Sequence, residues 1–267
     1  MIYSKLSGFK SPSFKGGVRG GFEGFSLQNH FILGIKTHLL TLLLFCSYSL
    51  SAQDFHLMGS AEQMLNGCIQ LTPDEPYMEG LAYSKRKMRL DQYFDIEFDI
   101  YLGNKDEGAD GIAFVIHTDP RGFGAYGTWG ECLGYGRWSK FYEGGTYIAP
   151  SIAVEFDTYY NPRQNDPRHD HVAYLENGTT YHEQYWHNND TNYNLEDGYL
   201  HSFRMVWNPE SQELLVALDG NVVYRQKKDL INEVFKGATE AIWGFTASTG
   251  RAHNLQYFCL KKWAMAP

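Results

Sequence analysis

Residues Glu155–His171 read EFDTYYNPRQNDPRHDH, and this stretch carries more chemical information than any other in the chain. It begins with two carboxylates on alternate residues. Residues i and i+2 of a β-strand face the same side, so Glu155 and Asp157 point together. The polar, proline-containing residues that follow predict a loop. That loop can fold Asn161, Asp166 and His171 back onto the end of the strand.

Several oxygens and one ring nitrogen gathered at a strand end are suitable ligands for metal ions. Calcium takes six to eight oxygen ligands. A neighbouring position with one imidazole and several carboxylates suits manganese or another transition ion, and Asp157 and Asp166 could bridge the two ions. The alternative interpretation is an ordinary acidic surface loop, because Asp, Asn and Pro are common in turns.

Short runs with strand-like alternation recur along the rest of the chain. Residues Tyr93–Tyr101 alternate apolar and acidic side chains, which indicates a half-buried antiparallel strand. Residues Gly111–His117 are apolar on both faces and indicate a buried strand. We expect further strands at 202–207, 213–218, 221–224, 241–246 and 254–260, with a hairpin turn at Asp219–Gly220. Only residues 227–235 suggest a helix, of one short turn. Many short strands separated by turns predict an antiparallel β-sandwich.

Three other segments carry motifs in a recognisable order: ADGIAFVI at 109–116, a glycine-rich run at 122–136 that contains Leu133-Gly134-Tyr135, and GFTASTG at 244–250. Together with the acidic stretch, they resemble the legume (L-type) lectin family, most closely its bacterial members, from about Phe55 to Trp263. The resemblance implies an all-β fold, a concanavalin-like jelly-roll sandwich of two antiparallel sheets. It implies a single lectin domain at residues 53–267 that binds glycans reversibly, without catalysis.

The resemblance also assigns the metal ligands by position. Glu155, Asp157, Asp166 and His171 would hold Mn²⁺ or another divalent transition metal. Asp157, Asn161, Asp166 and the backbone carbonyl of Tyr159 would hold Ca²⁺.

A sugar site is implied beside these ions. Asp110 would accept hydrogen bonds from two adjacent hydroxyls, after a cis Ala109–Asp110 peptide bond that bound calcium holds in place. Asn161 would donate its amide to the sugar, and Tyr159 would place its ring under it. The expected backbone donors are Gly130 or Gly134 in the glycine-rich loop, and Gly250, Arg251 and Ala252 in the closing loop. That closing loop is short, which in the family indicates mannose or glucose. The sequence departs from the bacterial pattern at Glu131-Cys132.

Residues 1–52 have the features of an export leader. An apolar run at 39–46 precedes the small-residue sequence Ser49-Leu-Ser-Ala52, so Gln53 is the expected first mature residue. The run is too short to span a bilayer. The basic head before it is unusually long, and represents either an extended leader or a start codon assigned too far upstream. Cys46 lacks a preceding small residue, which favours an exported protein over a lipoprotein. We therefore expect a secreted, periplasmic or cell-surface protein.

Export permits disulfides. Outside the leader the cysteines are Cys68, Cys132 and Cys259. In a sandwich of the legume lectin type, the first and last strands are neighbours in one sheet. The resemblance therefore implies a Cys68–Cys259 bridge, which leaves Cys132 as a free thiol.

Composition and charge exclude one class of partner. The formal net charge is −8, and the mature region has no basic stripe to bind phosphates, so we do not expect nucleic acid binding. The chain is rich in aromatic rings, which can stack on sugars, but β-sheet proteins are ring-rich in any case. The expected partners are glycans or glycoconjugates, and homo-oligomerisation is open.

The remaining histidines near the acidic stretch are not expected to bind metal. His169 is off the ligand register, and we interpret His182 and His187 as surface residues in a Tyr/Asn-rich insertion.

Two rival functions are open. The first is a glycoside hydrolase, whose paired carboxylates lie about 5 Å apart. Neither Glu155-Phe-Asp157 nor Glu97-Phe-Asp99 is followed by the second Glu that such enzymes carry. A structural or adhesive module of the same fold, without sugar binding, is the other rival.

Overall fold

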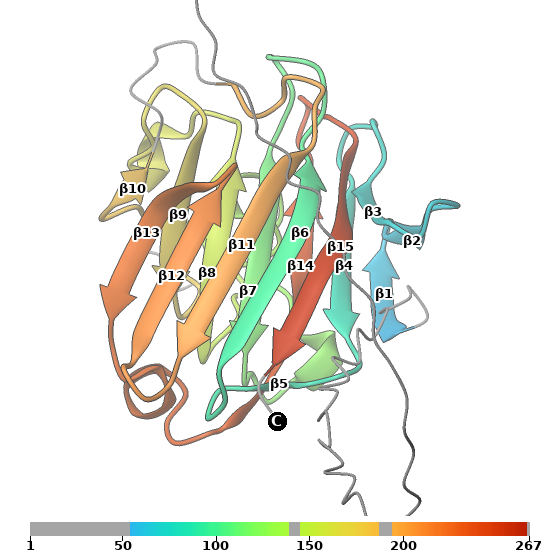
Figure 1. Ribbon diagram of the computed structural model, residues 1–267. Coiled ribbons are helices and arrows are strands. Elements are labelled where there is room, and N and C mark those ends of the chain that lie inside the picture. Colours follow the sequence, from blue (N-terminus) through green and yellow to red (C-terminus); the bar gives the residue numbers. More distant parts are fainter. Residues whose placement is uncertain (1–53, 139–144, 187–193, 266–267) are drawn as a thin grey trace, which may run out of the picture. The chain divides into compact units, whose positions relative to one another are not determined.

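The computed structural model describes residues 54–138, 145–186 and 194–265, and these form two antiparallel β-sheets packed face to face (Figure 1). The first sheet has the order β1-β4-β14-β7-β8-β9-β10, with β5 paired to β14. The second has the order β13-β12-β11-β6-β15-β3-β2. The expected two-sheet sandwich is therefore confirmed. The proposed leader lies outside the described residues.

The strands of the first sheet are β1 (Phe55–Gly59), β4 (Glu79–Ser84), β5 (Met88–Arg89), β7 (Gly111–His117), β8 (Ser151–Asp157), β9 (His171–Glu176), β10 (Tyr185–Trp186) and β14 (Glu240–Ser248). Those of the second are β2 (Glu62–Gln63), β3 (Ile69–Thr72), β6 (Phe94–Tyr101), β11 (His201–Asn208), β12 (Glu213–Leu218), β13 (Asn221–Lys227) and β15 (Gln256–Met265). Short 3₁₀ turns occur at Gly122–Gly124, Gly130–Cys132 and Pro162–Gln164.

The strands form where the alternation predicts them. In β6 the side chains of Phe94, Ile96, Phe98 and Ile100 are buried against the other sheet. Every residue of β7 is buried, as the unbroken apolar run predicts. The β12–β13 hairpin turns at Asp219 and Gly220, both with positive φ. The expected short helix is a single π-type turn, Leu230–Val234.

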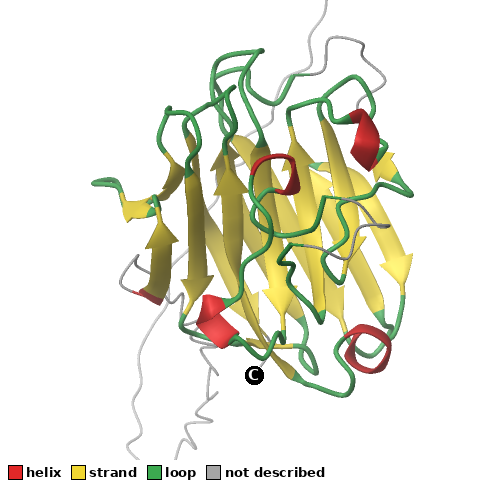
Figure 2. Ribbon diagram, turned by 180° about the vertical axis from the view of Figure 1, so that it is seen from behind, coloured by secondary structure: helices red, strands yellow, loops and turns green. Residues whose placement is uncertain are grey.

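Two apolar clusters lie on the two faces of the first sheet. The larger fills the space between the sheets and centres on Phe98, whose ring contacts those of Phe114, Phe245 and Phe258. The smaller lies on the outer face, where loop residues such as Leu133 and Tyr135 pack on the sheet. Figure 2 shows these loops covering that face. The glycine-rich loop is thus held against the strands that carry the acidic stretch.

The predicted disulfide is present. Cys68 immediately precedes β3 and Cys259 lies in β15, and the two strands pair with Phe258 opposite Ile69. The bridge joins residues separated by 191 positions. Cys132 is buried and free, as expected, and burial raises the pKa of its thiol. None of the helical segments in the described parts of the chain is long and apolar enough to cross a membrane.

Candidate metal and glycan site

The acidic stretch begins on β8 and ends on β9, which are adjacent antiparallel strands. Asp157, the last residue of β8, lies directly opposite His171, the first residue of β9. Glu155 lies opposite Ala173, two residues further into the sheet on the same face. The loop between the strands therefore has both of its ends fixed, and the predicted convergence is a result of the strand register.

The loop folds its polar groups inward. The backbone N–H of Tyr159 donates to Asp157 Oδ1 at 2.7 Å, and that of Asn161 donates to Asp166 Oδ2 at 2.6 Å. Pro162 starts a 3₁₀ turn that ends at Asn165 in the left-handed region. These contacts bring Asp166 back beneath the strand end, where its side chain is fully buried.

The geometry and chemistry of this cluster fit divalent cations. Ligand atoms of Asp157, Asp166 and His171 lie within 4.8 Å of one another, as do those of Glu155, His171 and His182. Glu155 Oε2 and Asn161 Oδ1 are buried, and neither has a hydrogen-bond partner in residues 54–138, 145–186 and 194–265. Burial and the Glu155 and Asp166 charges raise the pKa of Asp157 well above its usual value. Buried acceptors without donors are costly, so the cluster is suited to a positive ion.

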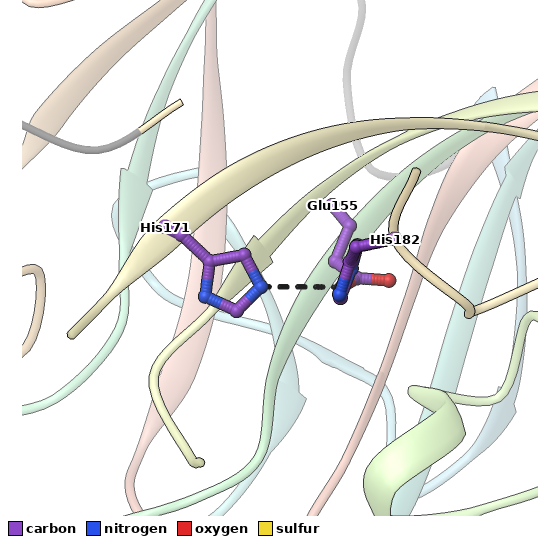
Figure 3. Close-up of side chains that lie close together, drawn as sticks. All are labelled: Glu155, His171 and His182. Carbon is purple, nitrogen blue, oxygen red and sulfur yellow. Dashed lines mark hydrogen bonds and ion pairs between the residues drawn. The ribbon is translucent and has the colours of Figure 1, made fainter. Parts of the chain in front are cut away.

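His182 was predicted to be a surface residue, and that prediction is wrong. Its exposed fraction is 1 %, and its ring lies between Glu155 and Asp166. Figure 3 shows it beside Glu155 and His171. Burial lowers its pKa, but the Glu155 and Asp166 carboxylates outweigh that effect and raise the pKa to about 10.

The sequence signals part of the path that brings His182 to the site. Asn177 and Gly178, both with positive φ, form a turn directly after β9, and Asn-Gly is a strong hairpin signal. The chain then returns along β9 as β10, with Tyr185 opposite Ala173. His182 lies in the connection before β10, and its backbone hydrogen bonds to Gln164 and Asn165, which the sequence does not predict, place it at the site. Of the other histidines in the predicted set, His169 contributes its carbonyl, which accepts a 3.3 Å hydrogen bond from His171 Nδ1. His187 lies outside the described residues.

Asp110 directly precedes β7, the strand that pairs with β8. The Ala109–Asp110 peptide bond is cis, as expected. The backbone of Asp110 donates to Ser248 O and accepts from Thr158 N, so it is fixed between β14 and the metal loop. Gly111 follows with φ +141°, and a Cβ there would lie 2.2 Å from Phe156 O. Only glycine permits this close approach.

The Asp110 carboxylate is buried beside the closing loop. Its Oδ2 has no hydrogen-bond partner within the described residues, and a Cβ on Gly250 would lie 3.6 Å from it. Burial and the nearby Glu131 charge raise its pKa to about 7. Arg251 and Ala252 follow Gly250 and line an open hollow of about 550 Å³ with residues 104–107 and His253.

The glycine-rich loop brings one unpredicted residue to the site. Glu131 Oε2 accepts a 3.3 Å hydrogen bond from Asn161 Nδ2, the amide expected to reach a sugar. Gly130 lies beside β14, since its carbonyl accepts from Ser248 Oγ at 2.9 Å. The N–H of Gly134 donates to Thr128 O, so it is engaged within the loop. Tyr159 is 43 % exposed, with its ring open to solvent.

Comparisons with known proteins agree with this architecture. The pattern of a family described as "Legume lectin beta-barrel domain" matches residues 48–262. The fold is similar to a lectin from Bauhinia forficata in complex with GalNAc (22 % identity, 82 % of this chain and 95 % of that chain, TM-score 0.64). It is also similar to the metal-free form of lectin I-B4 from Griffonia simplicifolia (21 % identity, 80 % of this chain and 93 % of that chain, TM-score 0.62).

Peanut lectin with a nine-residue peptide is a third similar structure (22 % identity, 83 % of this chain and 94 % of that chain, TM-score 0.60). At these identities the structural likeness concerns the fold. The family pattern, in contrast, matches most of the sequence, residues 48–262 of 267. This chain belongs to the legume lectin family.

Proposed function

We propose that this protein is a metal-dependent lectin that binds glycans reversibly and without catalysis. The observation that carries the proposal is the juxtaposition of a buried, cation-suited carboxylate cluster with Asp110. Thr158, within the metal loop, donates its backbone N–H to the carbonyl of Asp110 at 3.2 Å. A change in the loop is therefore transmitted directly to the expected sugar acceptor.

Two ions would occupy the cluster. Ca²⁺ would be held by Asp157, Asn161, Asp166 and the Tyr159 carbonyl, a set of oxygens that suits a hard cation. A transition ion such as Mn²⁺ would be held by Glu155, Asp157, Asp166 and His171. Support comes from the buried Asn161 Oδ1 and Glu155 Oε2, which have no donor among the residues that the structure describes. The ions supply charge that stabilises the loop, and the protein's own residues contact the glycan.

Recognition of a sugar needs hydrogen-bond acceptors, hydrogen-bond donors and an aromatic ring against which the apolar face of the sugar can stack. Asp110 would accept from two hydroxyls through its open carboxylate edge. The Tyr159 ring would lie under the sugar, and Asn161 would donate from its amide. Backbone N–H groups of Gly130 and of the closing loop at Gly250, Arg251 and Ala252 would complete the contacts. The N–H of Gly134 is already bonded, which favours Gly130 as the donor of that loop.

The expected sugar class rests on the length of the closing loop at Gly250–Ala252. That loop is short, which in the family favours mannose or glucose. The Bauhinia forficata lectin is described in complex with GalNAc, so a test must present both classes. The natural partner would be a glycan or glycoconjugate met outside the cytoplasm, and the Cys68–Cys259 bridge is compatible with such a location. Clustering of copies would raise the avidity of a weak single site.

One contact favours a second candidate, a structural module of the same fold without sugar binding. Glu131 occupies the Asn161 amide, which is the donor expected to reach a hydroxyl. The glycosidase alternative has less support. Glu97 and Asp99 lie on β6 in the other sheet, and each carboxylate lies 3.1 Å from Lys261 Nζ. Those two acids are therefore paired with a cation and apart from Glu155 and Asp157.

The direct test is a glycan array probed with the purified protein, loaded with Ca²⁺ and Mn²⁺ and again in EDTA. The proposal expects binding that EDTA abolishes and added metal restores. Binding that persists in EDTA would contradict the metal dependence. A folded, metal-loaded protein that binds no glycan would support the structural module.

A further inference from the structure

We infer that His182 is a direct second imidazole ligand of the transition-metal site, and that it increases the preference of the site for Zn²⁺ or a similar borderline ion over Mn²⁺. The inference rests on the proposed function only in assuming that the cluster binds a metal. It assigns a ligand at a position that the sequence motif does not include.

The first observation is the placement of the ring. His182 Nε2 lies 2.6 Å from Glu155 Oε1, and His182 Nδ1 lies 2.8 Å from Asp166 Oδ1. Both carboxylates belong to the predicted ligand set. The ring is therefore inserted between two ligands of the site, and its side chain is 1 % exposed. A buried imidazole in this position has access to the same space as the ion.

The second observation is the convergence of the two histidines. The rings of His171 and His182 have centroids 4.7 Å apart and are nearly perpendicular, at 89°. His171 Nε2 lies 4.0 Å from Glu155 Oε1, the oxygen that His182 also contacts. Figure 3 shows the two rings meeting at this carboxylate. Ligand atoms from all three residues lie within 4.8 Å of one another, a spacing that one ion can bridge.

The third observation is that the backbone of His182 is anchored to the metal loop. Its N–H donates to Gln164 O at 2.8 Å, and its carbonyl accepts from Asn165 Nδ2 at 2.7 Å. Further along, Tyr185 pairs with Ala173 in the β9–β10 ladder. The segment is thus fixed on both sides of the ring, so the position is built into the fold.

The chemistry of metal-bound histidine fits this environment. A ligand imidazole commonly donates its other ring N–H to a carboxylate or a backbone carbonyl. His182 Nε2 is hydrogen-bonded to Glu155 Oε1, whereas Nδ1 makes no hydrogen bond within the described residues although Asp166 Oδ1 lies 2.8 Å away. Nδ1 can therefore bind the ion while Nε2 keeps its hydrogen bond. His171 has the matching arrangement, with Nδ1 donating to the carbonyl of His169. Both rings are therefore oriented for coordination.

A second imidazole changes which ion is preferred. Carboxylate and water ligands suit Mn²⁺, Mg²⁺ and Ca²⁺, whereas imidazole suits Zn²⁺, Cu²⁺ and Ni²⁺. With His182 included, the site has two nitrogens and the carboxylates of Glu155, Asp157 and Asp166. The competing explanation is that His182 only bridges Glu155 and Asp166 as a proton-bearing ring and leaves the ion's coordination unchanged.

The test measures metal selectivity in the full chain. The protein is stripped with chelator, saturated with Ca²⁺, and titrated separately with Zn²⁺ and Mn²⁺ by calorimetry. Most nitrogen and oxygen sites bind Zn²⁺ more tightly than Mn²⁺, so the readout is how far the ratio of the two affinities changes when His182 is replaced. The His182→Ser variant should lose more Zn²⁺ affinity than the roughly ten- to hundredfold that removal of an outer-shell partner costs, with a much smaller change for Mn²⁺. Equal losses for the two ions would support the bridging role instead. His169→Ser is the matched control, because it removes a nearby imidazole but keeps the carbonyl that orients His171.

A second measurement needs no variant. Co²⁺ loaded into the wild type should give two strongly shifted, exchangeable imidazole N–H signals in the proton NMR spectrum, one from each ligand histidine. A single signal, or an unchanged Zn²⁺ affinity in His182→Ser, would overturn the inference and leave the proposed function intact. Failure of the wild type to bind any divalent ion would overturn both.

Discussion

The single residue on which glycan binding should depend most is Asp110. Its carboxylate is buried, one of its oxygens has no hydrogen-bond donor in the described part of the chain, and a Cβ on Gly250 would lie 3.6 Å from that oxygen. Its neighbour Glu131 adds negative charge, and together with burial this raises the pKa of Asp110 to about 7. A ligand that donates hydroxyl groups would relieve the cost of the buried acceptor.

Replacing Asp110 by Asn tests that role with almost no change in volume. One acceptor oxygen and the negative charge are lost, and hydrogen bonds to charged groups contribute about 1.5–3 kcal/mol. We expect at least a tenfold loss of glycan affinity in calorimetric titration, with Ca²⁺ binding retained. Equal affinities of the variant and the wild type for the same glycan would show that Asp110 is not the acceptor.

A second residue controls stability in mild acid. His117, at the end of β7, is completely buried, and its Nδ1 accepts a hydrogen bond from the backbone of Asp119. Burial lowers its pKa from 6.5 to about 4, although the charge of Asp119 acts in the opposite direction. The unfolded chain therefore binds a proton between these pH values while the folded protein does not. Stability must fall as the pH drops through this window.

We expect the His117 contribution to be lost between pH 6.5 and about 4, by up to roughly 3 kcal/mol. The His117→Asn variant keeps an acceptor near the Asp119 N–H but does not titrate, so this part of the acid sensitivity should disappear. Urea unfolding of both proteins in EDTA, at several pH values, measures the difference. Parallel stability curves for the two proteins would contradict the assignment.

At the residue scale, the sequence predicts ligands whose spacing is set by the strand itself. Glu155 and Asp157 follow from strand alternation, and the polar loop after them indicates Asn161, Asp166 and His171. His182 and Glu131 were not predicted as site residues, because each reaches the cluster through tertiary contacts. His182 depends on how far the chain loops out after Asn177-Gly178. Glu131 depends on how the glycine-rich loop packs on the first sheet.

At the element scale, the long alternating strands are predictable and the shortest ones are not. β6 and β7 have eight and seven residues, enough for a clear pattern. β2, β5 and β10 have two residues each, which is too few to show periodicity. These strands are fixed by their neighbours, as β10 is by β9. Tertiary pairing, which local sequence does not encode, decides where they form.

The Cys68–Cys259 disulfide links the paired strands β3 and β15. We expect it to stabilise the fold without affecting the geometry of the proposed glycan site. Replacing both Cys68 and Cys259 by Ser removes a link across 191 positions. Losing a native disulfide of long span costs roughly 2–5 kcal/mol. We expect that drop in the free energy of unfolding, measured by urea titration with metals bound.

Glycan affinity at low denaturant should be unchanged in the double variant, because β3 and β15 belong to the sheet that does not carry the site. The wild type under reducing conditions provides a comparison. Loss of glycan affinity in a variant that remains folded would show that the second sheet also positions the site.

At the scale of the whole molecule, the aromatic surplus is explained mainly by the core. The largest fully buried side chains are all aromatic, among them Trp207, Trp243, Phe98 and Phe114. These four pack between the two sheets, whereas Tyr159, in the metal loop, is open to solvent. Composition alone therefore predicts a well-packed β-sandwich more directly than a sugar-binding surface.

The same core makes the sandwich a rigid support for an acidic site. Carboxylates of Glu155, Asp157 and Asp166 are buried together at one end of the first sheet. Buried like charges are unfavourable unless a counter-charge is present. Two bound cations would supply that charge and also fix the loop against Asp110. We therefore expect both the order of the loop and glycan binding to depend on metal occupancy.

The most direct test is elemental analysis of the protein purified without chelator and dialysed against metal-free buffer. We expect about one Ca²⁺ and one transition-metal ion per chain, since the clustered ligands suit one hard and one borderline cation. A folded protein that contains neither ion, and takes up neither when both are supplied, would show that the carboxylate cluster is not a metal site.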